Sequence, residues 1–288
     1  MKKILLIAAV TVQAAMLYAQ RSYDVNVLQG EVGVTLGVAH YFGDLNTRAK
    51  LNRLKPAVGL FYRKQFNNYL GMRISAHYAQ LGYSDVYSKN LYQKTRNLSF
   101  NSDIVELAVH GDFNFFRFVP GDPDYKFTPY VTLGLGVFSY NPYAYLNNKK
   151  IFLRPLGTEG QNIGYVDPVT NKKRKAYGSM AVCVPVGIGV KYNINDKVNL
   201  SFQIAQRLTL TDYLDDISTT YIGLTNALTG LPNFPNPNAV ILQDRSFEKG
   251  NRIGVEGRQR GWSKQRDQYL IAEIGISLNF NSYKCPTF

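Results

Sequence analysis

The chain has 288 residues, 13% of them aromatic and only 18% charged, and a formal net charge of +13. This composition is too apolar for a disordered chain, and the length suits one large domain or two small ones. After the first twenty residues no apolar run approaches the ~18 residues that a membrane helix needs, which excludes a helical membrane protein. A basic excess is compatible with a nucleic acid, a membrane surface or an acidic partner.

Residues 1–19 have the pattern of a cleaved secretory signal peptide. Lys2 and Lys3 precede an almost wholly apolar stretch, and Ala19 stands just before the expected cut. The alternative is a short buried strand or helix. Cleavage would leave one domain, 20–288, and lower the net charge from +13 to +11, because two lysines leave with the peptide. Export argues against a nucleic-acid partner, and with no Cys after the cut a lipid anchor is not expected.

The rest of the chain repeatedly alternates apolar with small or polar residues, which is typical of strands with two different faces. Eight runs show this period of two, and each is about 10 to 15 residues long, longer than usual in soluble sheets. The runs are Glu31–Phe42, Ala57–Phe66, Leu70–Leu81, Ser102–Phe116, Thr128–Tyr140, Gly178–Tyr192, Lys197–Leu210 and Gln268–Phe280.

The connections between these runs alternate strictly between long and short. The long ones are 43–56, 82–101, 141–177 and 211–267, and the short ones are 67–69, 117–127 and 193–196. This asymmetry is typical of outer-membrane barrels with short periplasmic turns and long external loops. The sequence therefore predicts an all-β fold, an eight-stranded antiparallel transmembrane β-barrel with both termini in the periplasm. The alternative is a soluble, lipocalin-like barrel.

The face opposite each apolar face is expected to line the barrel. A barrel of eight strands has room only for side chains, so we expect the inward charges to pair and plug it. They are Arg63, Arg73, His77, Glu106, His110, Asp112, Lys191, Arg207 and Glu273. The enzymatic alternative is a dyad of His110 and Asp112 with a nearby Ser. No nucleophile motif and no dinucleotide loop accompanies it, so we expect a non-enzymatic protein without a cofactor.

The net charge of the mature chain is concentrated in the long loops, which together carry +10 of the +11. We expect one basic loop to face lipopolysaccharide head groups. Its residues are Lys149, Lys150, Lys172, Lys173, Arg174 and Lys175. Acidic residues follow two of the predicted strands: Asp44 comes after the first, and the segment 212–216, with three aspartates, comes after the seventh. Calcium is an alternative for them, although they lack a full ligand spacing.

A bridge between Cys183 and Cys285 needs Cα atoms within ~7 Å of each other, which this topology makes hard to achieve. We expect Cys183 to face the lumen and both thiols to be free, with Cys285 as a possible link to a partner.

Four segments together resemble the PorG-type outer-membrane barrels of the type IX secretion system. They are Tyr41-Phe42-Gly43-Asp44-Leu45-Asn46, Lys55-Pro56-Ala57-Val58-Gly59, Asp212-Tyr213-Leu214-Asp215-Asp216-Ile217-Ser218, and a short tail with Cys285-Pro286. The resemblance covers the whole mature chain. Gly43, Asp44, Asp212, Tyr213, Asp215 and Asp216 are the motif residues that it singles out.

The resemblance implies a non-enzymatic outer-membrane part of a protein-export machine, associated with the periplasmic ring lipoprotein and its partner subunit. Turn 117–127, with Pro120, Asp122 and Pro123, and the tail with Cys285 are the expected docking surfaces. Two alternatives remain: a general structural or lipopolysaccharide-binding barrel, and an enzyme of the lumen.

Overall fold

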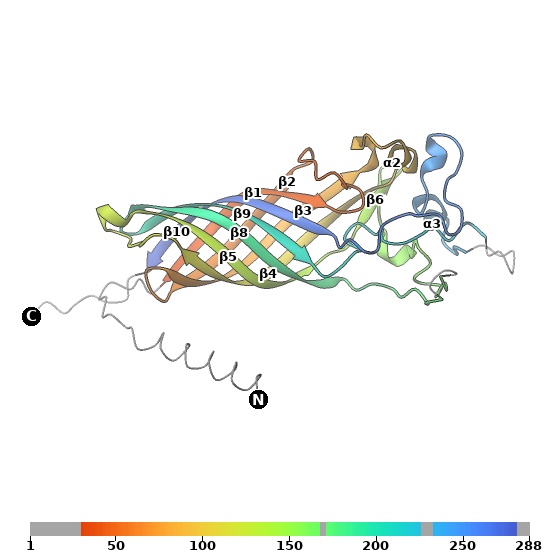
Figure 1. Ribbon diagram of the computed structural model, residues 1–288. Helices are drawn as coiled ribbons and strands as arrows, with labels where there is room; N and C mark the ends of the chain where they lie inside the picture. Colours follow the sequence, from red (N-terminus) through yellow and green to blue (C-terminus); the bar gives the residue numbers. More distant parts are fainter. Residues whose placement is uncertain (1–29, 168–170, 226–232, 281–288) are drawn as a thin grey trace, which may run out of the picture.

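A computed structural model of the chain describes residues 30–167, 171–225 and 233–280. Within these residues, eight long antiparallel strands close into a barrel (Figure 1). Around the barrel their order is β3-β2-β1-β10-β9-β8-β5-β4, and pairing of β4 with β3 completes the ring. The strands are β1 (Gly30–Phe42), β2 (Lys55–Gln65), β3 (Leu70–Ser84), β4 (Ser99–Asn114), β5 (Phe127–Ser139), β8 (Met180–Asn195), β9 (Val198–Thr209) and β10 (Gln268–Phe280).

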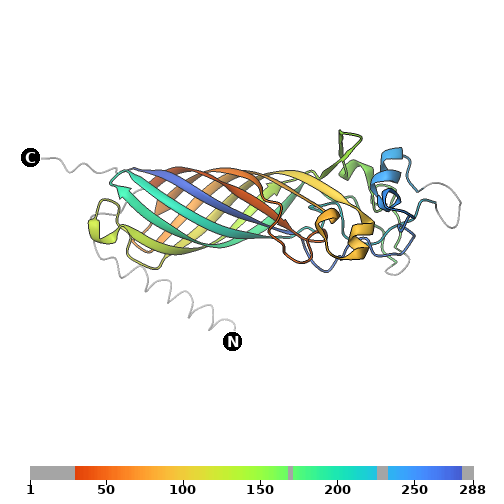
Figure 2. The same ribbon diagram turned by 90° about the horizontal axis from the view of Figure 1, so that it is seen from above.

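The predicted fold class is confirmed, and each of the eight predicted runs overlaps one barrel strand. Gly30 and Phe280 pair at one end of the barrel, where the short turns also lie. The four long loops gather at the opposite end (Figure 2). We call these the turn end and the loop end.

The long loops contain short elements that the period-of-two pattern missed. One is a hairpin of β6 (Tyr143–Leu146) and β7 (Lys149–Phe152), joined by Asn147 and Asn148. Both asparagines have a left-handed backbone, with φ of 50° and 60°, the conformation that tight hairpin turns require. The other short elements of the long loops are η1 (Asp85–Tyr87), α2 (Leu91–Arg96), η3 (Arg154–Leu156), α3 (Pro237–Leu242) and η4 (Ser246–Glu248). The short turn between β4 and β5 contains η2 (Pro123–Tyr125).

The outside of the barrel is apolar along the length of the strands. Leu36, Leu60 and Leu135 are all more than 60% exposed, which in water would be an unusually large apolar patch. Contact with lipid accounts for this exposed apolar surface, because an outward-facing apolar band is typical of a membrane-spanning barrel. Exposed aromatic side chains ring the turn end, as expected of an interfacial girdle: Phe66, Tyr69, Phe115, Phe116, Tyr192 and Phe280. Tyr41 and Tyr140, which also lie near strand ends, are buried inside instead.

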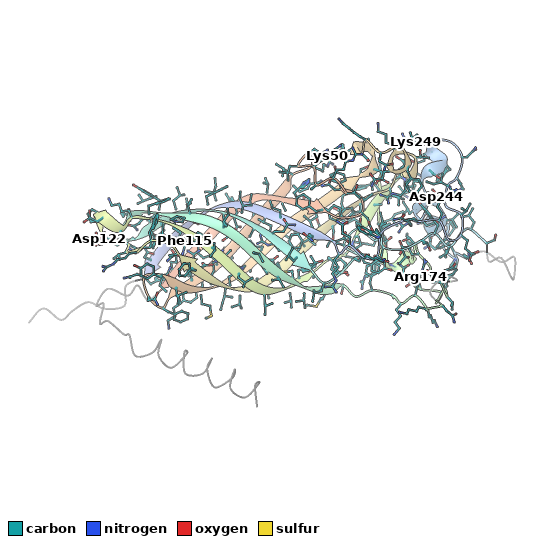
Figure 3. All side chains as sticks on the ribbon, in the orientation of Figure 1. Lys50, Phe115, Asp122, Arg174, Asp244 and Lys249 are labelled. Atoms are coloured by element: carbon teal, nitrogen blue, oxygen red, sulfur yellow. The ribbon has the colours of Figure 1, made fainter. Side chains whose placement is uncertain are left out.

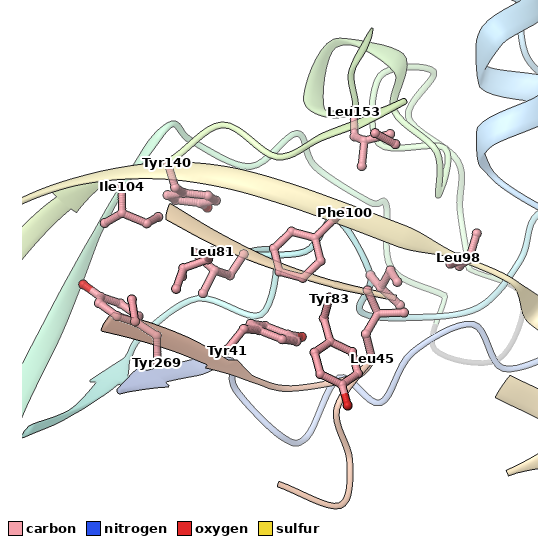
Figure 4. Packing of buried hydrophobic residues seen from close by; sticks show 14 of the residues in the cluster. Tyr41, Leu45, Leu81, Tyr83, Leu98, Phe100, Ile104, Tyr140, Leu153 and Tyr269 are labelled. Carbon is pink, nitrogen blue, oxygen red and sulfur yellow. The ribbon is translucent and has the colours of Figure 1, made fainter. Parts of the chain in front are cut away.

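The interior has two parts. Towards the turn end it is filled by polar and charged side chains. Towards the loop end it becomes an apolar core in which strand residues such as Tyr41, Phe100 and Tyr269 meet loop residues such as Leu45 and Leu153 (Figure 4). The loops thus form a folded cap whose core continues into the barrel. Across the described ranges, no helix is both long and apolar enough to span a membrane.

Candidate functional site

A first charged network crosses the lumen near the turn end. Arg63 pairs with Glu31 from β1 and with Asp112 from β4, where its Nε lies 2.7 Å from Oδ2. Arg73 reaches the same Asp112 oxygen at 3.4 Å. Lys191 from β8 donates to Asn114 Oδ1 at 3.0 Å. Two of these contacts, Arg63 with Asp112 and Lys191 with Asn114, tie together strands that are not neighbours in the sheet.

A second network lies closer to the loop end and centres on Glu106. Arg207 Nε lies 3.3 Å from one of its carboxylate oxygens, and the Tyr269 hydroxyl donates to the same oxygen. His77 bridges Glu106 and Glu273, at 3.5 Å and 3.1 Å. All five side chains are buried. An unpaired buried charge is strongly destabilising, so the pairing of these side chains with one another is required for a stable interior.

Glycines on the inward face make room for these bulky groups. A Cβ at Gly59 would stand 2.4 Å from the His77 ring, and one at Gly189 would stand 2.6 Å from the Tyr130 ring. The predicted inward set is therefore confirmed as buried, and it plugs the barrel: Arg63, Arg73, His77, Glu106, His110, Asp112, Lys191, Arg207 and Glu273.

The enzymatic alternative is only partly assembled. Ser75 Oγ lies 3.0 Å from His110 Nε2, as a nucleophile and its base would. However, His110 Nδ1 has no hydrogen-bond partner, and Asp112 is paired with Arg63 and Arg73 instead. A relay needs a carboxylate that orients the imidazole. This arrangement lacks it, and the three side chains are buried away from any substrate.

The acidic motif residues connect the loops of the cap. Both carboxylate oxygens of Asp44 accept from the backbone N–H of Trp262 at 3.0 Å, joining the first loop to the last. Asp216 accepts from the hydroxyls of Thr158 and Tyr177. Gly43 is needed beside them, because a Cβ there would stand 1.9 Å from Asp267 Oδ1.

Glu159 is a further link in the cap, which the sequence pattern did not reveal. Its carboxylate accepts from the backbone N–H groups of Ser218 and Thr219 at 3.0 to 3.1 Å and pairs with Arg260 at 3.0 Å. Nothing in the local sequence marks this residue, because its partners lie about 60 and 101 positions away.

A buried carboxyl pair shares one tyrosine. The Tyr41 hydroxyl lies 2.6 Å from Asp215 Oδ2 and 2.8 Å from Asp267 Oδ1. A phenol has one proton to donate, so one of the two carboxyls must itself carry a proton to complete both hydrogen bonds. Burial raises the pKa of Asp215 well above its usual range, and repulsion from Asp267 adds to this. Burial likewise raises the pKa of Asp267.

The other acidic motif residues are shifted in the same direction. Burial raises the pKa of Asp212 to about 8, against the opposing effect of its hydrogen bond with Ser218. Burial also raises the pKa of Asp44 and of Asp216 to about 6. The side chains in this cluster mostly bond within the cap, and the described residues contain no group of three or more His, Cys, Asp or Glu that could hold a metal ion. The calcium alternative gains no support.

The basic residues predicted to face lipopolysaccharide divide into two groups. Lys149, Lys150, Lys172, Lys173 and Lys175 are exposed at the loop end. Arg174 is not, which corrects the prediction. Its guanidinium donates to the carbonyls of Glu159 and Thr220 at 2.8 Å and is buried in the cap (Figure 3). Its planar group with several donors suits this bridging better than an ammonium would.

The predicted docking turn lies at the turn end, where Figure 3 labels Asp122. Pro123 is exposed, while Asp122 and Pro120 are half-buried. The Asp122 carboxylate accepts from the Asp124 N–H at 3.0 Å and so shapes the turn. A groove of about 680 Å³ runs beside it, lined by Tyr69, Phe115, Arg117, Tyr125, Lys126 and Tyr192 among others.

Cys183 faces the lumen as predicted. It is buried as a free thiol, with Sγ 3.9 Å from Glu106 Oε2. Cys285, the tail 281–288 and the signal peptide 1–19 lie outside the described residues.

Comparison with known proteins gives one family match. The family model described as "Domain of unknown function (DUF6089)" matches residues 9–154, just over half of the chain. No curated protein matches the sequence.

Among solved structures the chain is similar to Neisserial surface protein A (NspA), with a TM-score of 0.42, 10% identity and coverage of 88% of this chain and 97% of that one. It is also similar to Ail, the attachment invasion locus protein of Yersinia pestis, in complex with the heparin analogue sucrose octasulfate. That match has a TM-score of 0.38, 10% identity and coverage of 88% and 100%. The Pseudomonas aeruginosa outer membrane protein OprG matches with a TM-score of 0.36 at 9% identity, over 89% and 99%.

Proposed function

We propose that this chain, which belongs to the DUF6089 family, is a non-enzymatic outer-membrane component of the type IX secretion machinery. In this proposal the barrel crosses the outer membrane with both termini in the periplasm. It anchors the periplasmic ring, formed by a lipoprotein and its partner subunit. Support comes from the four sequence segments that resemble PorG-type barrels.

The observation that carries the anchoring role is the filled lumen. Two ion-pair networks and an apolar cap occupy the interior, and an eight-stranded barrel is too narrow to pass a polypeptide in any case. A barrel of this kind contributes to export by holding other subunits at the membrane. The turn end, with its exposed aromatic groove beside Pro123, is the surface that would meet periplasmic subunits.

A pull-down tests this proposal. The tagged full-length chain is purified in mild detergent from the cells that make it, and co-purifying proteins are identified by mass spectrometry. We expect the ring lipoprotein and its partner subunit. We also expect their recovery to fall when Pro123 is changed to Glu and the exposed Tyr125 to Ser, but not in a matched loop-end variant, Lys172→Ala. Absence of both ring subunits would contradict the proposal.

A general structural or lipopolysaccharide-binding barrel is the second candidate, and the exposed cations of the loop end favour it. In the same experiment it predicts abundant lipopolysaccharide and no ring subunits.

A further inference from the structure

One side of the loop end carries a dense group of cations. They come from two loop segments, 47–55 and 86–95, which we call the basic shoulder. The two segments contain six basic residues and no Asp or Glu: Arg48, Lys50, Arg53, Lys55, Lys89 and Lys94. Four large apolar side chains lie exposed in the same segments, namely Leu51, Leu54, Val86 and Leu91, at 53% to 78%.

The two segments of the basic shoulder pack side by side as one surface. Lys50 Nζ donates to the Tyr87 carbonyl at 3.2 Å. Nearby, the hydroxyl of Tyr83, at the end of β3, donates to Asn52 Oδ1 at 2.9 Å. The Arg53 guanidinium lies over the Tyr87 ring, 5.6 Å from its centre. Figure 3 shows Lys50 where the strands meet the cap.

The nearby acids of these loops are turned away from this surface. Asp85 is buried and pairs with Arg96 at 2.8 Å. Asp44 is buried against Trp262. The positive charge of the basic shoulder is therefore not neutralised from within its own loops. Elsewhere on the cap the signs are mixed, as where Arg245 pairs with Glu248 at 2.8 Å.

The basic shoulder begins where the apolar band ends. Val58, Tyr78 and Val105 form a row across β2, β3 and β4. The next outward-facing pair is polar, Gln80 opposite Asp103. Lys55 is three residues beyond Val58, which corresponds to about 10 Å along a strand. Lys55, the half-exposed first residue of β2, therefore lies just beyond the apolar rows of β2 to β4, at the height where lipid head groups are expected.

From this placement we propose that the basic shoulder binds the phosphorylated head group of lipid A, with the acyl chains lying on the outer face of β2 to β4. Lys and Arg match phosphate by charge and by hydrogen bonding, and exposed Leu54 and Val86 suit the first methylenes of the chains. The neighbouring carboxylate of Asp103 does not repel the phosphate in this arrangement, because Lys150 already pairs with it at 3.2 Å. The inference rests on the outer-membrane location proposed above, but not on any secretion partner.

The test compares two triple variants that change the net charge equally. One is Arg53→Glu, Lys55→Glu and Lys89→Glu in the basic shoulder. The control is Lys172→Glu, Lys173→Glu and Lys175→Glu in the loop between β5 and β8. Each full-length barrel is purified in detergent, and binding of purified rough lipopolysaccharide is measured, together with the same material after chemical removal of its phosphates. Outer-membrane fractionation and heat-modifiable gel migration confirm location and folding.

We expect the shoulder variant to bind at least about tenfold more weakly, since each surface cation contributes appreciably to binding of anionic lipid. The control should stay within about twofold, and dephosphorylated lipopolysaccharide should bind both proteins equally weakly. Equal loss in both variants would overturn the inference, because it would show general charge attraction. Unchanged binding in the shoulder variant would overturn it too. So would the finding that an acidic protein needs the basic shoulder for binding while lipopolysaccharide does not. A barrel that fractionates outside the outer membrane would instead refute the location itself.

Discussion

The two ends of the barrel interior are filled in contrasting ways. The half towards the turns holds charged side chains from different strands in ion pairs, such as Arg63 with Asp112. The half towards the loops is mostly apolar, and its acids are balanced by backbone N–H groups, hydroxyls and arginines. The first solution depends on charge pairing and the second on packing and bound protons. The two halves should therefore respond differently to mutation and to pH.

The largest effect is expected from removing one partner of a lumen ion pair. Arg207→Ala leaves the Glu106 carboxylate buried without its main counter-charge, so we expect a loss of about 3–5 kcal/mol in the free energy of unfolding. Urea unfolding of the barrel in lipid vesicles measures it. The double variant Arg207→Met with Glu106→Gln should recover much of the loss, because no uncompensated charge remains. Equal instability of both variants would contradict charge pairing as the cause.

A smaller loss is expected from crowding the same half. In Gly59→Ala the new methyl group would meet the His77 ring at 2.4 Å, and overpacking of this kind costs about 1–3 kcal/mol. Gly111→Ala on the outer face is the matched control, since its Cβ has no neighbour nearer than 3.8 Å. The same urea titration should separate the two variants. If they were equally stable, the lumen would have room that the structure does not show.

The cap should lose stability as the pH rises. Asp212 has its pKa raised to about 8 and Asp215 has its pKa raised well above the usual range, so the folded cap holds protons that the unfolded chain would release. Their stabilising effect is complete below pH ~4 and declines as the pH rises through the folded-state pKa values. Limited proteolysis of the loops should be several-fold faster at pH 9 than at pH 6.

Asp215→Asn should reduce this pH dependence, because an amide permanently replaces the protonated carboxyl. Asp122→Asn at the turn end is the control and should leave the profile of the cap unchanged. Proteolysis rates that do not change with pH in the parent protein would contradict the shared-proton arrangement around Tyr41.

The smallest effect is expected at the cap surface. Lys150 and Asp103 are both more than one-third exposed, and exposed ion pairs contribute only about 0–1 kcal/mol. Lys150→Ala should therefore shift the unfolding midpoint very little. A loss comparable to that of Arg207→Ala would show that the β6–β7 hairpin depends on this pair far more than its exposure allows.

The sequence predicted the barrel well because strand periodicity is local. The eight strands, the alternation of long and short connections and the inward charges all follow from a period of two along the chain. The cap was not predictable in this way. Glu159 is buried by partners 60 and 101 positions away, and Arg174 is joined to Thr220, 46 positions away. In the sequence Arg174 looked like one more basic loop residue beside Lys173. The β6–β7 hairpin was missed although Asn147-Asn148 is a recognisable turn signal.

A conductance recording tests the central claim, a sealed barrel acting as an anchor, most directly. The purified full-length protein is inserted into a planar lipid bilayer, with insertion verified by protease protection. We predict no stepwise ion current, because paired side chains and the apolar cap close the lumen from both ends. Stable conductance steps in the parent protein would show an open pore and would contradict the account.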